Sequence, residues 1–279
     1  MNWLLTTVSF RYYLYSIKEL LRLAEECGFE GIELWEPHYI RHRSEWERML
    51  PAGAARKLPA RVMSAYLDVT DFTLPEDEWL GRFGEKAEGC RRLGIPLVRL
   101  FTGNLAGLSA TDRDWSGFYR RLEKMQKHAA LHGIEVAFET HPGTLLDHPA
   151  GVERLISRIG RERWSCIGLN FDVFHVWEFG GSVPERLNDW YPYIKHVHLK
   201  NSRRRTGDFA MANVYHPLGR MADSDSISSG VVPIEPIVQS LRGRGYSGSL
   251  TLEWFGEVGR DFFHNEIEAL NGMIYATEG

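Results

Sequence analysis

The chain has few cysteines, and they lie far apart. Cys27, Cys90 and Cys166 are the three in 279 residues, and no Cys-x-x-Cys pair occurs. This spacing argues against a disulfide framework and against a structural zinc site built on thiolates. We therefore expect a protein of the reducing cytosol.

Long apolar segments are also missing. No apolar run approaches the ~20 residues that a membrane-spanning helix needs. The stretch from Met1 to Phe10 is apolar, but it lacks the charged start and the small-residue cleavage site of a secretory signal. These absences favour a cytoplasmic protein without a membrane partner.

A basic excess is absent as well. The chain has 33 Lys and Arg against 37 Asp and Glu, which gives a formal net charge of −4. Proteins that bind nucleic acid usually show the opposite balance. The short basic run of Arg203, Arg204 and Arg205 is therefore interpreted as a solvated loop, and we expect no nucleic-acid partner.

What the chain does have is 43% hydrophobic residues, arranged as short apolar runs that alternate with helical patterns. Its length suits one (β/α)₈ barrel or two smaller domains. Strands are expected at residues 3–10, 31–35, 61–67, 96–101, 134–138, 164–169, 194–200 and 249–253. Helices are expected at residues 16–27, 44–58, 76–93, 111–132, 150–159, just after 184, 234–241 and 262–275.

Eight strands that alternate with helices, without a linker or an internal repeat, predict a single (β/α)₈ TIM-barrel domain over residues 1–279. An open, doubly wound sheet is the alternative. It would need a glycine-rich phosphate loop after the first strand, and residues 9–13 contain no glycine. Residues 201–232 are too long for a plain connection, so we expect a lid or a binding element there.

Several of the expected strands end in side chains that are costly to bury alone. Four of them are Glu139, Asp172, His198 and Glu253. Barrel closure brings the carboxyl ends of strands together, where such groups would repel strongly without a cation. We therefore expect a divalent metal. Oxygen-rich ligands with one imidazole favour Mn²⁺ or Mg²⁺, with Co²⁺ or Zn²⁺ as alternatives.

Two histidines in this region allow alternative roles. His196 and His198 face the same side of their strand, and His198 is preferred as a ligand because it lies nearer the carboxyl end. His141 follows Glu139 by two residues and so projects to the same side of an extended chain. It is either a support for Glu139 or a general base beside a metal-bound carbonyl.

Other polar residues near the strand ends are candidate substrate contacts. Arg99 is a cation inside an apolar strand, which requires a buried partner or a substrate carboxylate. Lys200 lies at a strand end and would face an anionic substrate. His175 and Glu178, expected with Asp172 at the end of the strand that begins at 164, are either supports for the ligands or substrate contacts.

Four motifs carry a resemblance to a known family. They are Glu-x-His-Pro at 139–142, Asn-x-Asp-x-x-His at 170–175, His-x-His-x-Lys at 196–200, and Leu-Glu-Trp-Phe-Gly at 252–256. Together they resemble the xylose-isomerase-like TIM-barrel superfamily and, more narrowly, the 3-dehydroshikimate dehydratases of petrobactin-type siderophore pathways. The similarity covers almost the whole chain. It is weak at 36–60 and at 202–229, except for Asn213-Val214-Tyr215.

The resemblance implies a role for each candidate residue. The implied metal ligands are Glu139, Asp172, His198 and Glu253, and the implied catalytic base is His141. The implied substrate-binding residues are Tyr66, Arg99, His175, Glu178 and Lys200.

The resemblance also implies an activity. It is a metal-dependent dehydratase, a hydro-lyase that converts 3-dehydroshikimate, an anionic cyclic enone carboxylate, to 3,4-dihydroxybenzoate (protocatechuate) and water. No redox cofactor is needed. A sugar or sugar-phosphate isomerase or epimerase is the alternative, but the cations Arg99 and Lys200 favour a carboxylate substrate. Siderophore synthesis and aromatic catabolism both stay open as pathways, as do a monomer and a homo-oligomer.

Overall fold

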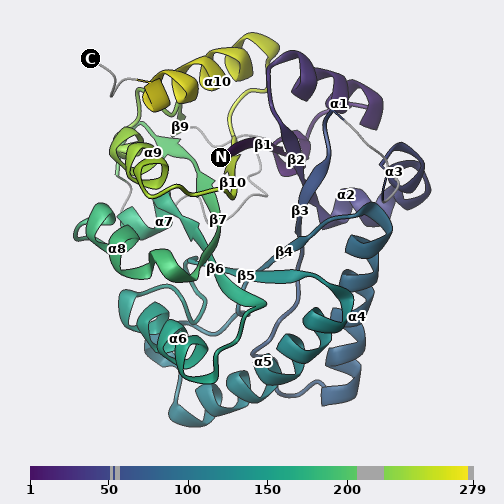
Figure 1. Ribbon diagram of the computed structural model, residues 1–279, viewed down its shortest axis with the longest axis vertical. Coiled ribbons are helices and arrows are strands. Elements are labelled where there is room, and N and C mark those ends of the chain that lie inside the picture. Colours follow the sequence, from purple (N-terminus) through teal and green to yellow (C-terminus); the bar gives the residue numbers. More distant parts are fainter. Residues whose placement is uncertain (51–52, 54–56, 206–222, 276–279) are drawn as a thin grey trace.

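The chain folds into a closed barrel of parallel strands surrounded by helices (Figure 1). The computed structural model describes residues 1–50, 53, 57–205 and 223–275. The order around the barrel is β1-β10-β7-β6-β5-β4-β3-β2, so the last barrel strand pairs with the first. Closure is direct, because Leu4 of β1 lies opposite Thr251 of β10. This confirms the predicted (β/α)₈ barrel.

The eight barrel strands are short and mostly buried. They are β1 (Asn2–Thr6), β2 (Gly31–Trp35), β3 (Ala60–Ser64), β4 (Leu97–Leu100), β5 (Glu135–Glu139), β6 (Ile167–Asp172), β7 (Ile194–Leu199) and β10 (Ser249–Leu252). Outside the barrel, β8 (Asn201–Ser202) and β9 (Ser224–Asp225) form an antiparallel pair. All eight barrel strands overlap the segments predicted from the sequence.

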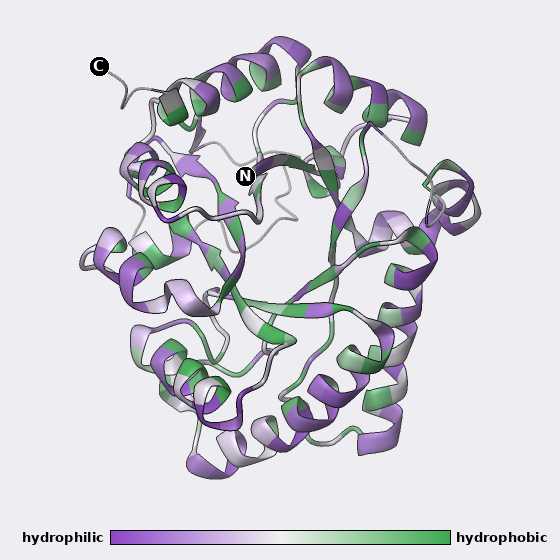
Figure 2. Ribbon diagram, viewed as in Figure 1, coloured by the Kyte–Doolittle hydropathy of each residue, from purple (hydrophilic) through white to green (hydrophobic). Residues whose placement is uncertain are grey.

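The helices cover the outside of the barrel. They are α1 (Ile17–Glu26), α2 (Glu36–Arg41), α3 (Arg43–Met49), α4 (Glu76–Leu93), α5 (Asp112–His132), α6 (Pro149–Glu162), α7 (Val173–Glu178), α8 (Val183–Trp190), α9 (Ile234–Gly243) and α10 (Arg260–Tyr275). Their outward faces are mostly hydrophilic and the faces toward the strands are mostly hydrophobic (Figure 2). No helix within the described ranges is long and apolar enough to cross a membrane.

Local signals set the ends of several helices, as predicted. The Ser16 side chain accepts from the backbone N–H of Glu19 and the Glu19 carboxylate accepts from that of Ser16, a capping box that starts α1. Thr111 opens α5 in the same way. Gly133 ends α5 in the left-handed conformation, with φ of 64°, where glycine has no steric penalty.

Two predicted elements are wrong in extent. The first strand ends at Thr6 and not at Phe10, because a 3₁₀ turn over Thr7–Phe10 follows. The Thr6 hydroxyl accepts from the backbone N–H of Val8 and caps this turn. The broken helix predicted at 44–58 overlaps α3, which ends at Met49, and α2 precedes it without a predicted counterpart. Residues 51–52 and 54–56 of that prediction lie outside the described residues.

The barrel interior is layered, and this layering positions the site. Leu4, Val62, Leu97 and Ala137 form a small buried apolar cluster, separate from the main core. Two residues farther along their strands, and therefore on the same face, Leu97 is followed by Arg99 and Ala137 by Glu139. The interior thus changes from apolar to charged toward the carboxyl ends of the strands.

One side chain ties together the two ends of the long segment after β7. The amide group of Asn201 donates to the carbonyl oxygens of Ile227 (3.1 Å) and Val232 (3.0 Å), and its oxygen accepts from the N–H groups of Ser202 and Val232 (both 2.9 Å). This brings residue 232 back to the barrel beside the end of β7. The lid predicted within 201–232 falls largely on residues 206–222, which lie outside the described residues.

Candidate metal centre and active site

Four predicted ligands meet at the carboxyl ends of the strands. They are Glu139 at the end of β5, Asp172 at the end of β6, His198 in β7 and Glu253 just after β10. One ligand atom from each lies within 4.8 Å of the others, and each residue is at most 4% exposed. The predicted convergence is therefore confirmed, and the four groups could hold a metal ion.

The orientation of His198 fits a cation at this place. Its Nδ1 faces three carboxylates, at 3.5 Å from Glu139 Oε2, 3.5 Å from Glu253 Oε1 and 3.8 Å from Asp172 Oδ2. Within the described part of the chain, this buried nitrogen has no hydrogen-bond partner. A buried polar atom without a partner is costly, and a ligand atom aimed at a metal position accounts for it.

Two cations border the carboxylates. Lys200 Nζ lies 2.7 Å from Asp172 Oδ2 and 2.8 Å from Glu253 Oε2, so it bridges two predicted ligands. Arg99 Nε lies 2.7 Å from Glu139 Oε2. The sequence required a buried partner or a substrate carboxylate for Arg99, and the structure provides the buried partner Glu139.

The environment shifts the pKa of the predicted ligands in different directions. Burial raises the pKa of Asp172 to about 6, although Lys200 opposes this. Burial also opposes ionisation of Glu253, but Lys200 and His198 outweigh it and lower its pKa to about 2. Burial disfavours the charged form of His198, yet Glu33, Glu253 and Glu139 raise its pKa to about 9. The carboxylates thus stabilise positive charge at this place, supplied here by Lys200, Arg99 and His198, and a divalent cation could take the same place.

The predicted base His141 lies beside the cluster. A nitrogen of His141 lies within 4.8 Å of ligand atoms of Glu139 and His175, and its ring centroid is 4.3 Å from that of Phe101. Its Nδ1 donates to the carbonyl oxygen of Pro142 at 2.8 Å, which leaves Nε2 with the lone pair. Burial, and then Lys200 and Arg99, lower the pKa of His141 to about 3, so its imidazole is neutral.

The segment after Asp172 differs from its prediction. The sequence was interpreted as a strand that carries Asp172, His175 and Glu178 at its end, but the strand stops at Asp172 and α7 begins at once. The reason is local: Asp172 Oδ1 accepts from the backbone N–H of His175 at 3.0 Å and caps the helix. The same carboxylate therefore serves the cluster and the start of α7.

His175 and Glu178 form a pair on α7, where a spacing of three residues places them on one face. His175 Nδ1 lies 2.8 Å from Glu178 Oε2, and His175 Nε2 lies 4.0 Å from Asp172 Oδ2. Burial raises the pKa of Glu178 to about 8 and lowers that of His175 well below its usual value. The rings of His175 and His141 are 4.8 Å apart, so the pair faces the predicted base.

Tyr66 lies at the rim of this group. Its ring centroid is 5.9 Å from that of Phe101, and it is 37% exposed. Its hydroxyl accepts from Trp35 Nε1 at 2.8 Å, and its backbone N–H donates to Glu36 at 2.8 Å. Phe101 also lies under the Arg99 guanidinium, at 4.3 Å from the ring centroid, and so connects Tyr66 with the predicted cation.

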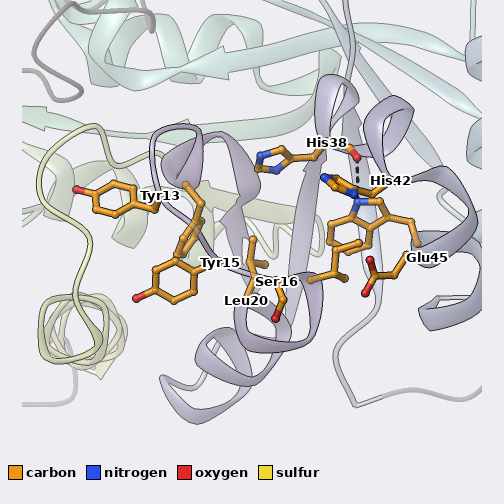
Figure 3. Close-up of a pocket in the computed structure, with 10 residues that line it drawn as sticks. Tyr13, Tyr15, Ser16, Leu20, His38, His42 and Glu45 are labelled. Carbon is orange, nitrogen blue, oxygen red and sulfur yellow. Dashed lines mark hydrogen bonds between the residues drawn. The ribbon is translucent and has the colours of Figure 1, made fainter.

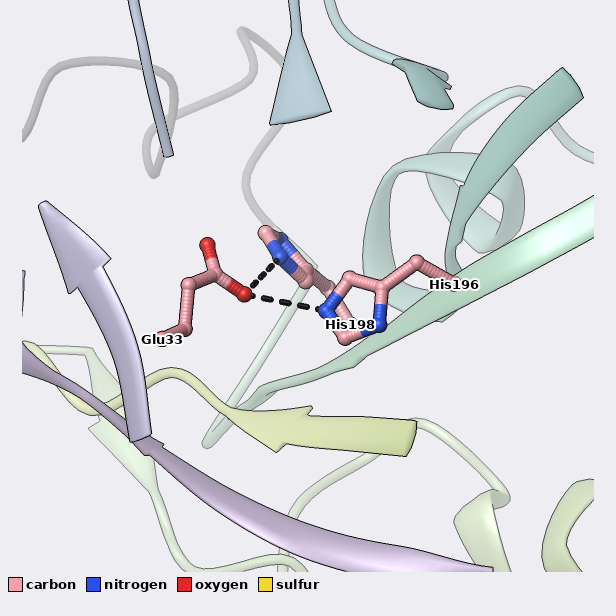
Figure 4. Close-up of side chains that lie close together, drawn as sticks. All are labelled: Glu33, His196 and His198. Carbon is pink, nitrogen blue, oxygen red and sulfur yellow. Dashed lines mark hydrogen bonds and ion pairs between the residues drawn. The ribbon is translucent and has the colours of Figure 1, made fainter. Parts of the chain in front are cut away.

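The structure also reveals a residue without a role in the sequence predictions. Glu33 in β2 is fully buried, and its Oε2 lies 2.9 Å from Nε2 of both His198 and His196 (Figure 4). Burial by itself would raise the pKa of Glu33, but the two histidines hold it well below its usual value. An acidic residue in the middle of the apolar run Gly31–Trp35 was the signal that could have identified it.

The same contact decides between the two histidines of β7. His196 belongs with Glu33 and is not part of the four-residue cluster, whereas His198 contacts both groups. His198, the histidine preferred from the sequence, is the one that lies with the carboxylates, and its role as a metal ligand stays a prediction. Asn170 supports the cluster from β6, because its side-chain amide donates to Glu139 Oε2 at 3.1 Å.

A separate cavity lies between α1, α2 and α3 (Figure 3). Its volume is about 230 Å³, and its walls include Tyr13, Tyr15, His38, His42 and Trp46. None of the ten residues predicted for catalysis, metal or substrate lines it. The cavity is thus distinct from the candidate site.

Fold and site together define a (β/α)₈ barrel with a carboxylate–imidazole centre suited to a divalent cation. The chain belongs to the xylose isomerase-like TIM barrel family, whose sequence profile matches residues 21–273.

The chain is also similar to several individual proteins. The chain is 29% identical to the 3-dehydroshikimate dehydratase of Bacillus anthracis over 97% of its own length and 96% of the relative's. It matches the crystal structure of the probable 3-DHS dehydratase AsbF, involved in petrobactin synthesis in Bacillus anthracis, with a TM-score of 0.85 and 27% identity over 97% and 99% of the two chains. The IolI protein with a bound zinc atom matches with a TM-score of 0.74 over 99% of both chains, but at 15% identity this shows the shared fold alone. The predicted resemblance is confirmed.

Replacing Lys200 with methionine should destabilise the metal-free protein. The change leaves Asp172 and Glu253 buried without their shared cation, and breaking a buried ion pair costs roughly 3–5 kcal/mol. Added Mn²⁺ should then raise the melting temperature of Lys200→Met more than that of the wild type, because it restores positive charge. Thermal melting after chelation, with and without Mn²⁺, measures both effects.

Lys195→Met is the matched control. Lys195 lies on β7, the strand that Lys200 directly follows, and it pairs with Glu135, whose side chain is 48% exposed, so its loss should cost at most about 1 kcal/mol. If Lys200→Met melts like the control, the charge balance inferred for the cluster is wrong.

Proposed function

We propose that the protein is a metal-dependent dehydratase that converts 3-dehydroshikimate to 3,4-dihydroxybenzoate and water. The observation that carries the proposal is the buried group of three carboxylates and His198, bordered by Arg99 and Lys200. A relative similar over nearly the whole chain is a 3-dehydroshikimate dehydratase, which supports this reaction among those found on this fold. The chain from 1 to 279 would act as a single catalytic domain.

The proposed ligands are Glu139, Asp172, His198 and Glu253. Oxygen-rich ligands with one imidazole suit Mn²⁺ or Mg²⁺, with Co²⁺ or Zn²⁺ as alternatives. When bound, such a cation would stabilise the negative charge that develops on a ketone oxygen.

His141 is the proposed base. Its Nε2 is available because Nδ1 donates to Pro142, and it would take the ring proton that is conjugated to the ketone. The C–O bond to the β-hydroxyl then breaks, and the proton can pass from His141 to the departing group to give water. This elimination leaves a cyclohexadienone. Loss of a second ring proton and protonation of the ketone oxygen then make the ring aromatic, and no external oxidant or reductant is needed. A bound anionic substrate would also offset Lys200 and Arg99, two of the influences that lower the pKa of His141.

Arg99 is the proposed anchor of the substrate carboxylate. Its Nε pairs with Glu139, but its buried Nη1 has no hydrogen-bond partner among the described residues. Lys200 would add positive potential on the opposite side. Tyr66, and the pair of His175 and Glu178, would line the pocket around the ring of the substrate.

The sugar isomerase or epimerase alternative is not favoured. Arg99 and Lys200 are both at most 4% exposed, and a neutral sugar offers two buried cations no anionic group. Against a sugar phosphate, the argument is the similarity to a 3-dehydroshikimate dehydratase over nearly the whole chain. Solved epimerases match the chain at 15–17% identity, which shows the fold alone.

The proposal also covers the cellular location, the pathway of the product and the partners of the protein. The three cysteines are free, as suits a reducing cytoplasm. A catechol product would serve either siderophore synthesis or aromatic metabolism. We propose a small-molecule substrate and no nucleic-acid partner, and a homo-oligomer is compatible with this site.

Purified protein with Mn²⁺ should convert 3-dehydroshikimate to 3,4-dihydroxybenzoate, seen as a rise in aromatic absorbance. Glu253→Ala should lose both bound metal and turnover, because it removes one of the four proposed ligands. Elemental analysis of the washed variant gives the metal content. Metal-free wild type is the control for turnover, and full metal retention in Glu253→Ala would exclude Glu253 as a ligand.

Replacing Arg99 with methionine should raise the KM for 3-dehydroshikimate. Truncating a buried charged contact costs roughly 2–5 kcal/mol, and Arg99→Lys, which keeps the charge, should recover part of it. Metal content is measured in parallel because Arg99 also contacts Glu139. If KM and kcat both stay at wild-type values, Arg99 serves only as the ion-pair partner of Glu139.

His141→Ala should keep its metal but lose roughly 10²–10⁴ in kcat, the usual contribution of a general base. The four proposed ligands are untouched by this change, so elemental analysis should match the wild type. A supporting histidine would behave differently, since excess Mn²⁺ would then restore turnover. Near-full recovery with Mn²⁺ would move the base elsewhere, with His175 the next candidate.

A further inference from the structure

Next to the cluster of Glu139, Asp172, His198 and Glu253, three hydrogen-bond donors converge on one carboxylate oxygen of Glu33. Glu33 Oε2 lies 2.9 Å from Nε2 of His198, 2.9 Å from Nε2 of His196 and 2.7 Å from the hydroxyl oxygen of Thr251 (Figure 4 shows the contacts with both histidines). The four residues come from β2, β7 and β10, and none is more than 1% exposed. This arrangement joins three separate strands in a dry part of the barrel.

The acceptor fixes which nitrogen of His198 carries a proton. An ionised carboxylate can only accept hydrogen bonds, so Nε2 of His198 must be the donor in this contact. In the neutral imidazole, Nδ1 then holds the lone pair, and Nδ1 is the atom that faces Glu139, Asp172 and Glu253. Glu33 therefore selects the tautomer that a metal ligand at this position requires.

We infer that Glu33 is a positioning residue of the metal centre. Its carboxylate holds the His198 ring with Nδ1 directed into the ligand cluster and strengthens the donation from that nitrogen to a cation. His196 Nε2 and the Thr251 hydroxyl donate to the same oxygen, but the contact that orients His198 is the one with Glu33 itself. The inference rests on the proposed function, because it assumes the ligand set given there.

A second cation held by Glu33, His196 and His198 is the competing interpretation of the same group. Such a cation would need Nε2 of both histidines as lone-pair donors. Binding of this cation would have to displace the proton on Nε2 of each histidine. The cation would also compete with the hydrogen bond from Thr251 to Glu33. The three donors already occupy Oε2, whereas Oε1 has no hydrogen-bond partner among the described residues. The donor contacts on Oε2 favour positioning of His198 over a second metal.

Glu33→Gln and Thr251→Val separate these roles. Glutamine is isosteric with glutamate but uncharged, so the variant tests the charged acceptor at nearly constant shape. Its affinity for Mn²⁺, measured by competition with a coloured chelator, should fall by roughly 10–100-fold. The visible absorption spectrum of its Co²⁺ form should also differ from that of wild-type protein, because the contribution of His198 changes.

Thr251→Val is the matched control. It removes one donor to the same oxygen but leaves the contact between Glu33 and His198, so its Mn²⁺ affinity and Co²⁺ spectrum should stay close to the wild type. Circular dichroism checks that each variant is folded. If Glu33→Gln does not fold, Glu33→Asp replaces it, since this change keeps the charge but draws the oxygen back by one methylene.

The outcomes separate this inference from the proposed function. Wild-type affinity and an unchanged Co²⁺ spectrum in the folded Glu33 variant would overturn the role of Glu33 and leave the dehydratase intact. Wild-type protein that binds neither Mn²⁺ nor Co²⁺ would overturn the proposed ligand set and the inference with it. Two equivalents of Co²⁺ in wild-type protein but one in Glu33→Gln would favour the second-cation interpretation.

Discussion

Repulsion between buried carboxylates is the constraint on which the rest of this site depends. Carboxylate oxygens of Glu139, Asp172 and Glu253 lie 3.5–3.8 Å from Nδ1 of one imidazole, and Glu33 contacts the other nitrogen of the same ring. Arg99, Lys200 and His198, whose pKa is raised to about 9, offset this negative charge. A divalent cation held by the cluster would supply positive charge without the loss of side-chain entropy.

The barrel makes this concentration of charge tolerable by separating it from the core. Apolar side chains fill the lower layer of the interior, and the polar side chains lie above them on the same strand faces. Each carboxylate also has a second task, which limits its freedom to move. Asp172 caps α7, Glu139 accepts from Asn170, and Glu33 joins β2 to β7. The site is therefore held by the same contacts that hold neighbouring elements together.

The fold alone does not select a reaction, since proteins of the same fold have different activities. A metal beside an imidazole base suits proton abstraction next to any carbonyl. This barrel holds a pair of buried cations, together with the neutral His141 between Phe101 and His175. Those groups match a flat, anionic ring better than a neutral sugar.

The sequence by itself determined the barrel and the polar strand ends, because strand and helix signals are local and parallel strands bring their carboxyl ends to one face. It could not determine which polar groups touch. The contact of Glu33 with His198 spans 165 positions, and it follows from strand register and barrel closure. The same reason applies to Lys200, which bridges two carboxylates from different strands, and to His196, which lies with Glu33. Even α7, a local element, was missed because Asp172 is both the end of a strand and the cap of a helix. The contacts of Glu33, His196 and Lys200 were decided by tertiary structure, since each depends on how two distant strands are aligned in the barrel.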